Sequence, residues 1–292
     1  MGGTQSDYRC EFGYYSLTRK LVHIFNGAPV TDGDGVALIR YFGAEAMPML
    51  DPLLLLDHFE SEMKGNLGGG FPPHPHRGFE TVTYMLEGRI RHKDNIGNEG
   101  VIEPGGVQWM TAGKGIVHSE MPEQKEGRMK GFQLWINLPS SHKMTAPKYQ
   151  EFTVDQIPVE KTDGGGFIRV IAGETDSGLT GPVLNELTKP IYLDAALAAG
   201  EVFEQSLPDD HNAAVFMISG TATINDEEIE TEQMGILSTG STIEIAAGPD
   251  GSRFLLIAAK PLNEPVARGG PFVMNSEAEV HQAFADYRAG AL

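Results

Sequence analysis

Short apolar runs separated by turn residues place the strongest constraint on how this chain can fold. The sequence has 36 glycines and 18 prolines in 292 residues, spread along its length. Apolar or alternating runs that stop at Gly, Pro or Asn are typical of antiparallel strands. Four such runs are residues 36–41, 80–85, 132–136 and 254–257. The pattern predicts an all-β fold built from short strands.

The clearest helix signal lies close to the C-terminus. Ser276 and Glu279 form a capping pair ahead of Val280, Phe284 and Tyr287, which follow at helical spacing. This pattern predicts a short C-terminal helix with a structural role.

An internal repeat suggests two similar β domains. Residues 84–88 (Tyr-Met-Leu-Glu-Gly) align with residues 216–220 (Phe-Met-Ile-Ser-Gly), and Gly106 then falls near Gly235. A chain of this length accommodates about two domains. The stretch 139–150 has two prolines, two serines and little apolar periodicity, which is typical of a linker. We therefore predict domains at residues 1–140 and 141–292, the second carrying the helix.

Charge and cysteine content exclude several functions and compartments. A formal net charge of -18 disfavours contact with a nucleic-acid backbone, which requires clustered Lys and Arg. The single cysteine, Cys10, can form neither an internal disulfide nor a thiolate zinc site, so any metal must bind nitrogen and oxygen. A reducing compartment fits best, the cytoplasm or, in a eukaryote, also the nucleus.

Membrane association receives little support from the sequence. No run reaches the roughly 20 apolar residues of a membrane span, and no signal peptide is recognisable. The opening residues Met1 to Ser6 match the short N-myristoylation pattern, but the pattern is unspecific and a flexible terminus is the preferred interpretation.

Two pairs of potential metal ligands carry the strongest chemical signal. His74 and His76 are two residues apart, as are His118 and Glu120 further along the chain. Alternate residues of a strand project from the same face, so two neighbouring strands would bring all four side chains to one point. Three imidazoles and one carboxylate suit a divalent transition metal with positions left for water or substrate. The plainer interpretation, four unrelated core or surface residues, requires a coincidence of two spaced pairs.

The segments around these ligands resemble the pirins, a family of the cupin superfamily. The resemblance is carried by residues 70–82 (GFPPHPHRGFETV), 108–122 (QWMTAGKGIVHSEMP), 131–139 (GFQLWINLP) and 270–275 (GPFVMN). It implies a bicupin of two antiparallel, jelly-roll-like β-barrels with ferrous iron, Fe(II), in the first barrel. The implied ligands are the residues aligned with the family's own, His74, His76, His118 and Glu120.

The resemblance also implies two classes of function. One is a quercetin 2,3-dioxygenase activity that opens flavonols with O2. In that mechanism Glu120 would be the catalytic base, because a carboxylate that loosens from the metal can accept the substrate's hydroxyl proton. The other is a non-enzymatic, metal-dependent binding protein with a transcriptional or metabolic partner. Other divalent transition metals could occupy the same donors.

Several further residues are weaker candidates for the site. Glu80 would lie on the ligand face if one strand ran unbroken from His74, and we expect it to orient a ligand imidazole. Phe71, Trp109, Met110 and Phe132 could line a pocket for a flat aromatic substrate, or could be ordinary core residues.

The second domain is expected to bind no metal. Alignment through the internal repeat places residues without suitable donors opposite the four ligands: Ser206, Pro208, Ala247 and Pro249. Apolar side chains, namely Val215, Met217, Ile236 and Leu256, are expected to fill its interior.

Overall fold

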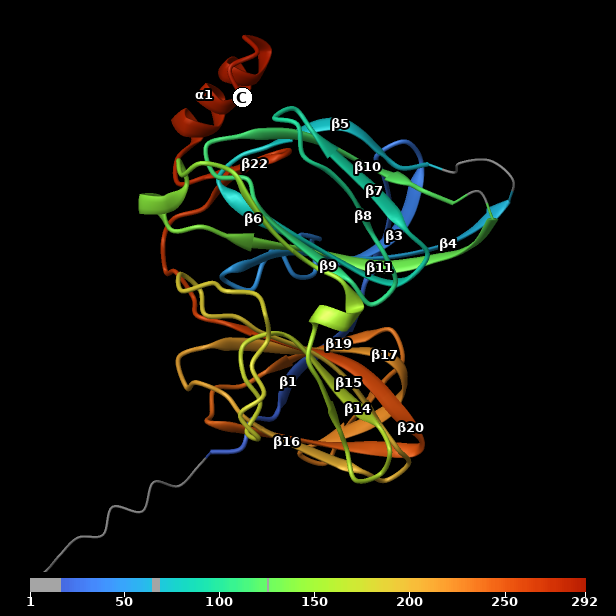
Figure 1. The fold of residues 1–292 in the computed structure, drawn as a ribbon. Helices are drawn as coiled ribbons and strands as arrows, with labels where there is room; N and C mark the ends of the chain where they lie inside the picture. Colours follow the sequence, from blue (N-terminus) through green and yellow to red (C-terminus); the bar gives the residue numbers. More distant parts are fainter. Residues whose placement is uncertain (1–16, 65–68, 125) are drawn as a thin grey trace, which may run out of the picture.

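In the residues that the structure describes, two β-sandwiches lie one above the other (Figure 1). The structure is a computed structural model, and it describes residues 17–64, 69–124 and 126–292. The N-terminal lipidation pattern and Cys10 lie outside this part of the chain. No helix in the described ranges is long and apolar enough to cross a membrane.

The first sandwich consists of two antiparallel sheets, counted over the described ranges. The smaller has the order β5 (Phe71–His76), β10 (Ile116–Pro122), β7 (Ile90–Asp94) and β8 (Glu99–Ile102). The larger has the order β12 (Lys148–Phe152), β9 (Val107–Thr111), β6 (Phe79–Glu87), β11 (Glu126–Asn137), β4 (Leu53–Lys64), β3 (Val36–Phe42) and β2 (Ala28–Asp32). Because the two sheets are hydrogen-bonded separately, this unit is a sandwich and not a closed barrel.

The second sandwich is a single antiparallel sheet that bends over itself. Its order over the described residues is β1 (Leu21–Asn26), β19 (Gln233–Leu237), β17 (Asn212–Ile224), β20 (Thr242–Ala259), β15 (Ile191–Leu197), β14 (Phe167–Ala172) and β13 (Val159–Lys161). In addition, β16 (Val202–Ser206) pairs with β20, and β18 (Glu227–Glu230) pairs with β17. The first part of β20 pairs with β16 and its last part with β15, so one strand serves both layers.

The expected all-β class and internal repeat are confirmed. The aligned segments lie in β6 and β17, and the strand orders β9-β6-β11 and β19-β17-β20 correspond. The predicted helix is α1 (Glu277–Arg288), and Ser276 caps it by accepting a hydrogen bond from Glu279 N. The Glu279 carboxylate reaches past Ser276 to accept from Asn275 N at 3.1 Å.

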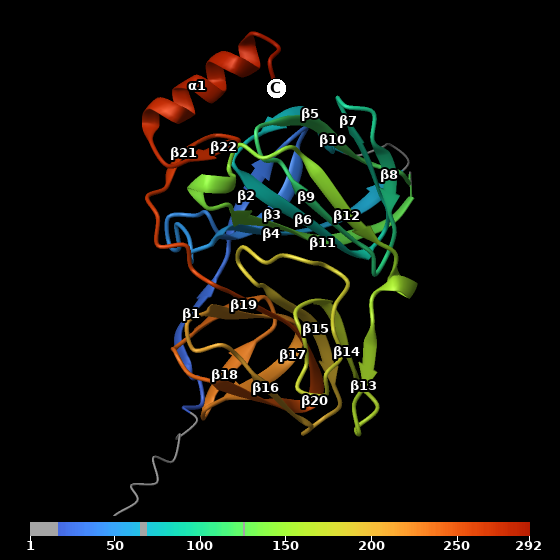
Figure 2. The same cartoon turned by 60° about the vertical axis from the view of Figure 1, so that its left-hand side comes forward.

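The two ends of the chain cross between the sandwiches. β1 pairs with β19, so the first described strand belongs to the second sandwich. In the opposite direction, residues 264–292, here called the C-terminal strap, lie against the first sandwich (Figure 2). The strap contains β21 (Ala267–Gly269), β22 (Phe272–Met274) and α1.

The boundary expected near residue 140 therefore lies later in the chain. After the short turn η1 (Ser140–His142), β12 still pairs with β9 in the first sandwich. The chain passes to the second sandwich through η2 (Val154–Gln156), and β13 then pairs with β14. The proline- and serine-containing stretch is a loop within the first sandwich, because the strand that follows it completes that sheet.

An apolar core joins the two sandwiches. Even-numbered side chains of β6 and β11, such as Val82, Tyr84, Phe132 and Leu134, face the second sandwich and are fully buried. They pack with buried residues of that sandwich, including Phe216. The strand period of two then directs the odd-numbered residues into the first sandwich, where the functional site lies.

A buried ion cluster lies within this interface. Asp194, which is fully buried, accepts a hydrogen bond from Tyr84 Oη at 2.5 Å across the interface. It also accepts from Arg253 Nε and Nη2 at 2.9 and 2.7 Å, and it pairs with Arg169 at 3.4 Å. The buried carboxylate of Asp194 and the groups that surround it thus satisfy one another's hydrogen bonds and charges, which burial would otherwise leave unpaired.

Replacing Asp194 by alanine should therefore destabilise the protein by about 3–5 kcal/mol, because it leaves cations and a hydroxyl without their acceptor. Urea unfolding measures this loss. The exposed Asp250→Ala variant is the control and should stay within about 0.5 kcal/mol of wild type. A loss below about 1 kcal/mol for Asp194→Ala would contradict a stabilising role of this cluster.

Candidate metal centre

The two ligand pairs lie on neighbouring strands. β5 and β10 pair antiparallel, with His74 opposite His118. β5 carries prolines that cannot donate backbone hydrogen bonds, and it lies at a sheet edge, where they are tolerated. The register shifts between His118 and Glu120 because β5 contains an extra residue there, which places Glu120 opposite Phe71.

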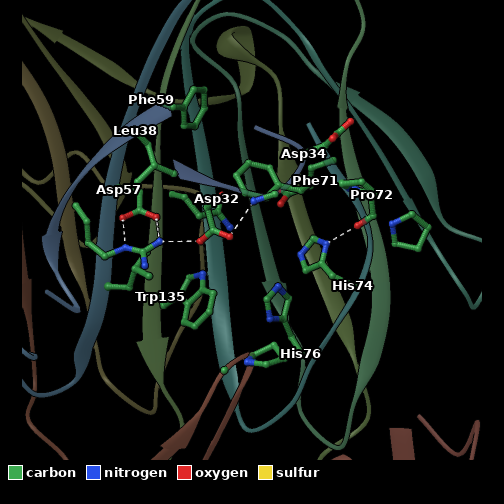
Figure 3. A pocket seen from close by; sticks show the side chains of 18 of the residues that line it. Asp32, Asp34, Leu38, Asp57, Phe59, Phe71, Pro72, His74, His76 and Trp135 are labelled. Atoms are coloured by element: carbon green, nitrogen blue, oxygen red, sulfur yellow. Dashed lines mark hydrogen bonds and ion pairs between the residues drawn. The ribbon is translucent and has the colours of Figure 1, made fainter. Parts of the chain in front are cut away.

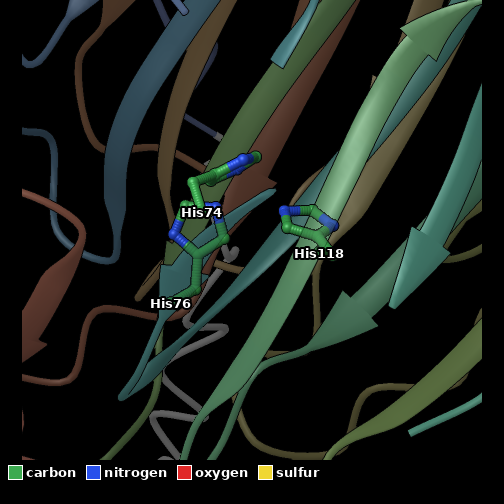
Figure 4. Close-up of side chains that lie close together, drawn as sticks. All are labelled: His74, His76 and His118. Carbon is green, nitrogen blue, oxygen red and sulfur yellow. The ribbon is translucent and has the colours of Figure 1, made fainter. Parts of the chain in front are cut away.

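Three imidazoles converge at this pairing. His74, His76 and His118 each offer a ring nitrogen, and these nitrogens lie within 4.8 Å of one another (Figure 4). His76 and His118 are 3% and 1% exposed. Burial, reinforced by the neighbouring imidazoles, lowers the pKa of both well below the usual value. Both rings are therefore neutral near pH 7 and keep the lone pair that a metal requires.

Hydrogen bonding indicates which nitrogens are available. His74 Nδ1 lies 2.8 Å from Pro72 O, and because a carbonyl only accepts, Nδ1 carries the proton and Nε2 keeps its lone pair. The buried Nδ1 of His76 and Nε2 of His118 have no hydrogen-bond partner in the described chain. Clustered, orphaned imidazole nitrogens fit a divalent metal ion, which would satisfy all of them.

Glu120 borders this group. Its Oε2 lies 4.0 Å from His118 Nε2, and its Oε1 lies 2.9 Å from the Thr83 hydroxyl. Burial raises the pKa of Glu120, while His74 and the Thr83 hydrogen bond oppose that shift. The same hydroxyl lies 2.7 Å from Gln133 Oε1, and its single proton can serve one of the two oxygens at a time. The carboxylate is thus close enough to join the metal and has a hydroxyl to hold it.

His92 also touches the site, although its spacing gave no sign of it. It lies on β7 opposite Glu120, is 1% exposed, and places its Nδ1 3.4 Å from His118 Nδ1. If Nε2 of His118 is the ligand, Nδ1 must carry the proton and donate it to His92. A partner of this kind fixes the tautomer and orientation of a metal-binding imidazole.

His92→Phe should weaken metal affinity about 10- to 100-fold, because His118 loses its acceptor while the ring contact with Tyr149 is kept. Competition with a chelator measures the affinity. His58→Phe is the matched control, since His58 is also buried but packs against Phe132 and Phe216 outside the site. Equal affinities in His92→Phe and wild type would refute the orienting role.

A cavity of about 610 Å³ opens beside the imidazoles. His74, His76 and Glu120 line it, and Figure 3 shows His74 and His76 beside it with Phe71 and Trp135 close by. Its apolar wall consists of Leu38, Leu55, Phe59, Phe71 and Trp135. Both the volume and the largely apolar lining are typical of a small-molecule site.

An ion cluster also lines the cavity. Arg40 donates through Nε and Nη2 to the two carboxylate oxygens of Asp57 at 2.7 and 2.6 Å. Its Nη2 also donates to Asp32 at 3.0 Å. One guanidinium is thus shared by two carboxylates, and the cluster keeps a formal net charge of -1.

The structure divides the expected pocket residues into two groups. Phe71 lines the cavity. Trp109 and Phe132 belong instead to the core between the sandwiches, and Met110 packs with Ile116. The cavity-lining residues of β11 are Gln133 and Trp135, which alternate with Phe132 and so face the other way.

The expectation that Glu80 orients a ligand imidazole is wrong. The strand breaks at Gly78, whose φ of +89° reverses the chain into the other sheet. Glu80 then faces the second sandwich, where its carboxylate accepts from Trp109 Nε1 at 3.0 Å, Thr111 Oγ1 at 2.7 Å and Asn185 Nδ2 at 2.6 Å. It joins the two sandwiches and makes no contact with the imidazoles through these bonds.

The interior of the second sandwich differs chemically from that of the first. Val215, Met217 and Leu256 are buried in its apolar interior. Ile236 instead faces the core between the sandwiches, because it alternates with the interior residues of its strand. The absence of metal from this sandwich remains a prediction.

Comparison with known proteins gives consistent matches. The family model described as Pirin matches residues 35–136, and that described as Pirin C-terminal cupin domain matches residues 192–292. A pirin-like protein of Caulobacter vibrioides is 51% identical over 93% of this chain and 98% of that protein. A solved structure of quercetin 2,3-dioxygenase from Acinetobacter baumannii has a TM-score of 0.87 and 34% identity, covering 94% of this chain and 98% of that one. A bacterial pirin from Escherichia coli, solved with nickel(II), shares the fold at a TM-score of 0.65 and 22% identity, covering 82% of this chain and 99% of that one.

Proposed function

This chain belongs to the pirin family, and we propose that it is a metal-dependent dioxygenase that cleaves flavonols such as quercetin with O2. The cavity carries this proposal. Its volume of about 610 Å³ suits a flat molecule of three rings, and its lining brings apolar walls directly to His74, His76 and Glu120.

Ferrous iron, Fe(II), is the proposed metal, held by His74, His76, His118 and Glu120. Nitrogen and carboxylate donors of this kind suit non-haem iron, although nickel, copper, manganese and zinc compete for the same donors according to supply. When bound, iron(II) supplies Lewis acidity toward the substrate's chelating oxygens and redox chemistry with O2. A reducing cytoplasm, which the single cysteine favours, would keep the iron ferrous.

Glu120 is the proposed general base. Burial raises the pKa of its carboxyl, so the carboxylate is a stronger proton acceptor than one in water. The Thr83 hydroxyl is in place to hold Oε1, which leaves Oε2 to receive the proton of the substrate's hydroxyl. The side chain thus serves as ligand and base in turn.

The apolar walls position the substrate and keep water from it. Phe71 and Trp135 both line the cavity, and Trp135 packs edge-on against His76 with ring centroids 5.2 Å apart. Flat aromatic rings pack well against such side chains. Exclusion of water also strengthens the electrostatic effect of Glu120 on the bound substrate.

The proposed activity predicts oxygen uptake that depends on iron and on a flavonol. Protein loaded with iron(II) under argon and then mixed with oxygenated quercetin should consume O2 well above the rate of an equal amount of free iron. Zinc-loaded protein is the control and should show no uptake, because zinc has no redox chemistry. An uptake rate no higher than that of free iron, over a panel of flavonols, would contradict the proposal.

The alternative is a non-enzymatic protein whose metal state is recognised by a regulatory partner. Such a protein needs no cavity at the metal, so the cavity favours the enzyme. The same uptake experiment separates the two, since a metal-loaded but inactive protein would favour the regulatory role.

A further inference from the structure

Among the described residues, one guanidinium that lines the cavity beside the proposed metal site has no carboxylate within ion-pair distance. Arg268, on strand β21 of the C-terminal strap, lies over the Trp135 ring with its Cζ 4.9 Å from the ring centroid. Its Nη1 donates to Leu54 O at 3.3 Å. Within the described ranges it forms no ion pair, and this backbone contact is its one hydrogen bond through the side chain.

Arg40, the other guanidinium in the cavity, differs in this respect. Its Nε and Nη2 are taken by Asp57 and Asp32, so it has no free charge to offer a ligand. The carboxylates of Asp57 and Asp32 also interact electrostatically with Arg268. Their ion pairs, however, are with Arg40. Arg268 is therefore the cavity guanidinium whose N–H groups, apart from the one that donates to Leu54 O, are left for a ligand within the described ranges.

Backbone contacts fix Arg268 relative to the proposed ligands. Arg268 pairs with Val273 in the β21–β22 hairpin, and Val273 N donates to Arg77 O at 3.0 Å, next to His76. Lys143 Nζ, buried in the same region, donates to Val273 O and to Gly78 O at 2.9 and 2.7 Å. The strap is thus tied to the strand that bears His76, and Trp135 contacts both that imidazole and the guanidinium.

We propose that Arg268 is a specificity-determining residue that binds a second anionic oxygen of the substrate, a phenolate remote from the oxygens that chelate the metal. A guanidinium stays charged at any physiological pH, and a substrate that fills the cavity removes water from it. A neutral ring edge would leave that charge unpaired, whereas a phenolate would pair with it through charge-assisted hydrogen bonds. The inference rests on the proposed function for the placement of the chelating oxygens.

The test compares flavonols that differ only in a remote hydroxyl. Protein loaded with iron(II) is titrated under argon with 3-hydroxyflavone, 3,7-dihydroxyflavone, 3,4'-dihydroxyflavone and the remote methyl ethers of the last two. Wild type should bind at least one of the dihydroxy compounds about 10-fold or more tightly than 3-hydroxyflavone, a gain that its methyl ether loses. The Arg268→Gln variant should bind the members of the series within about twofold of one another. Arg268→Lys should keep part of the preference, since it keeps the charge but not the planar fork.

Arg89→Gln is the matched control, because Arg89 is 48% exposed and pairs with Glu103 at 3.8 Å on the surface. It should retain the full preference. Equal binding of all the compounds by wild type, or a preference that survives in Arg268→Gln, would overturn the inference. If oxygen uptake fails while the preference is present and requires Arg268, the anion subsite stands and the dioxygenase does not. If uptake occurs without any preference, the subsite alone is refuted.

Discussion

The double substitution His74→Ala, His118→Ala is expected to leave a folded protein that retains less than about a tenth of a metal ion per chain, against about one in wild type. It removes two of the three clustered imidazoles, one from each of the paired strands. His76 and Glu120 that remain cannot hold a transition metal against water and buffer. Elemental analysis after iron loading and dialysis measures the content.

The controls are His142→Ala and His281→Ala, which remove exposed imidazoles and should change nothing. Full metal retention by the double variant would show that the ion binds elsewhere. The same measurement tests the second sandwich, because a residual equivalent of iron in the double variant would contradict the prediction that this sandwich binds none.

The Glu120→Gln variant should retain substrate binding yet turn over about 10²- to 10⁴-fold more slowly, the usual contribution of a general base. The amide has the shape of the carboxylate and can still accept from the Thr83 hydroxyl. It cannot accept the substrate's proton at neutral pH. Stopped-flow binding under argon and oxygen uptake in air separate the two effects.

Glu103→Gln provides the comparison, since that carboxylate is 60% exposed and is not among the residues that line the cavity. It should match wild type in binding and turnover. A wild-type rate for Glu120→Gln, with its metal content verified, would remove Glu120 from the role of base.

The sequence supports the class of fold and the position of the ligand pairs because both depend on local patterns. Alternation and turn residues predict β3, β6, β11 and β20, and the repeat predicts the correspondence of the two sandwiches. The spacing of two residues places His74 with His76 on one face without any knowledge of register.

Features that depend on strand register or on pairing between distant strands could not be predicted from the sequence. Phe132 was a pocket candidate, but it lies in the core, whereas Trp135, which has the opposite parity on the same strand, lines the cavity. His92 reaches His118 only because β7 pairs with β10. The ligand-face position expected for Glu80 requires one strand through Gly78, where the chain turns instead.

β1 belongs to the second sandwich and the C-terminal strap lies against the first, so the order of synthesis affects when the cavity can form. The strands that bear the imidazoles leave the ribosome before the strap, whose Asp286 pairs with Arg77 from a position 209 residues further along the chain. β1, which precedes the other described strands in the sequence, has no ladder partner until β19 is made. Domains usually fold in the order of their synthesis, but here neither sandwich is complete until the other is nearly made. The cavity wall closes late, so metal is expected to enter after translation.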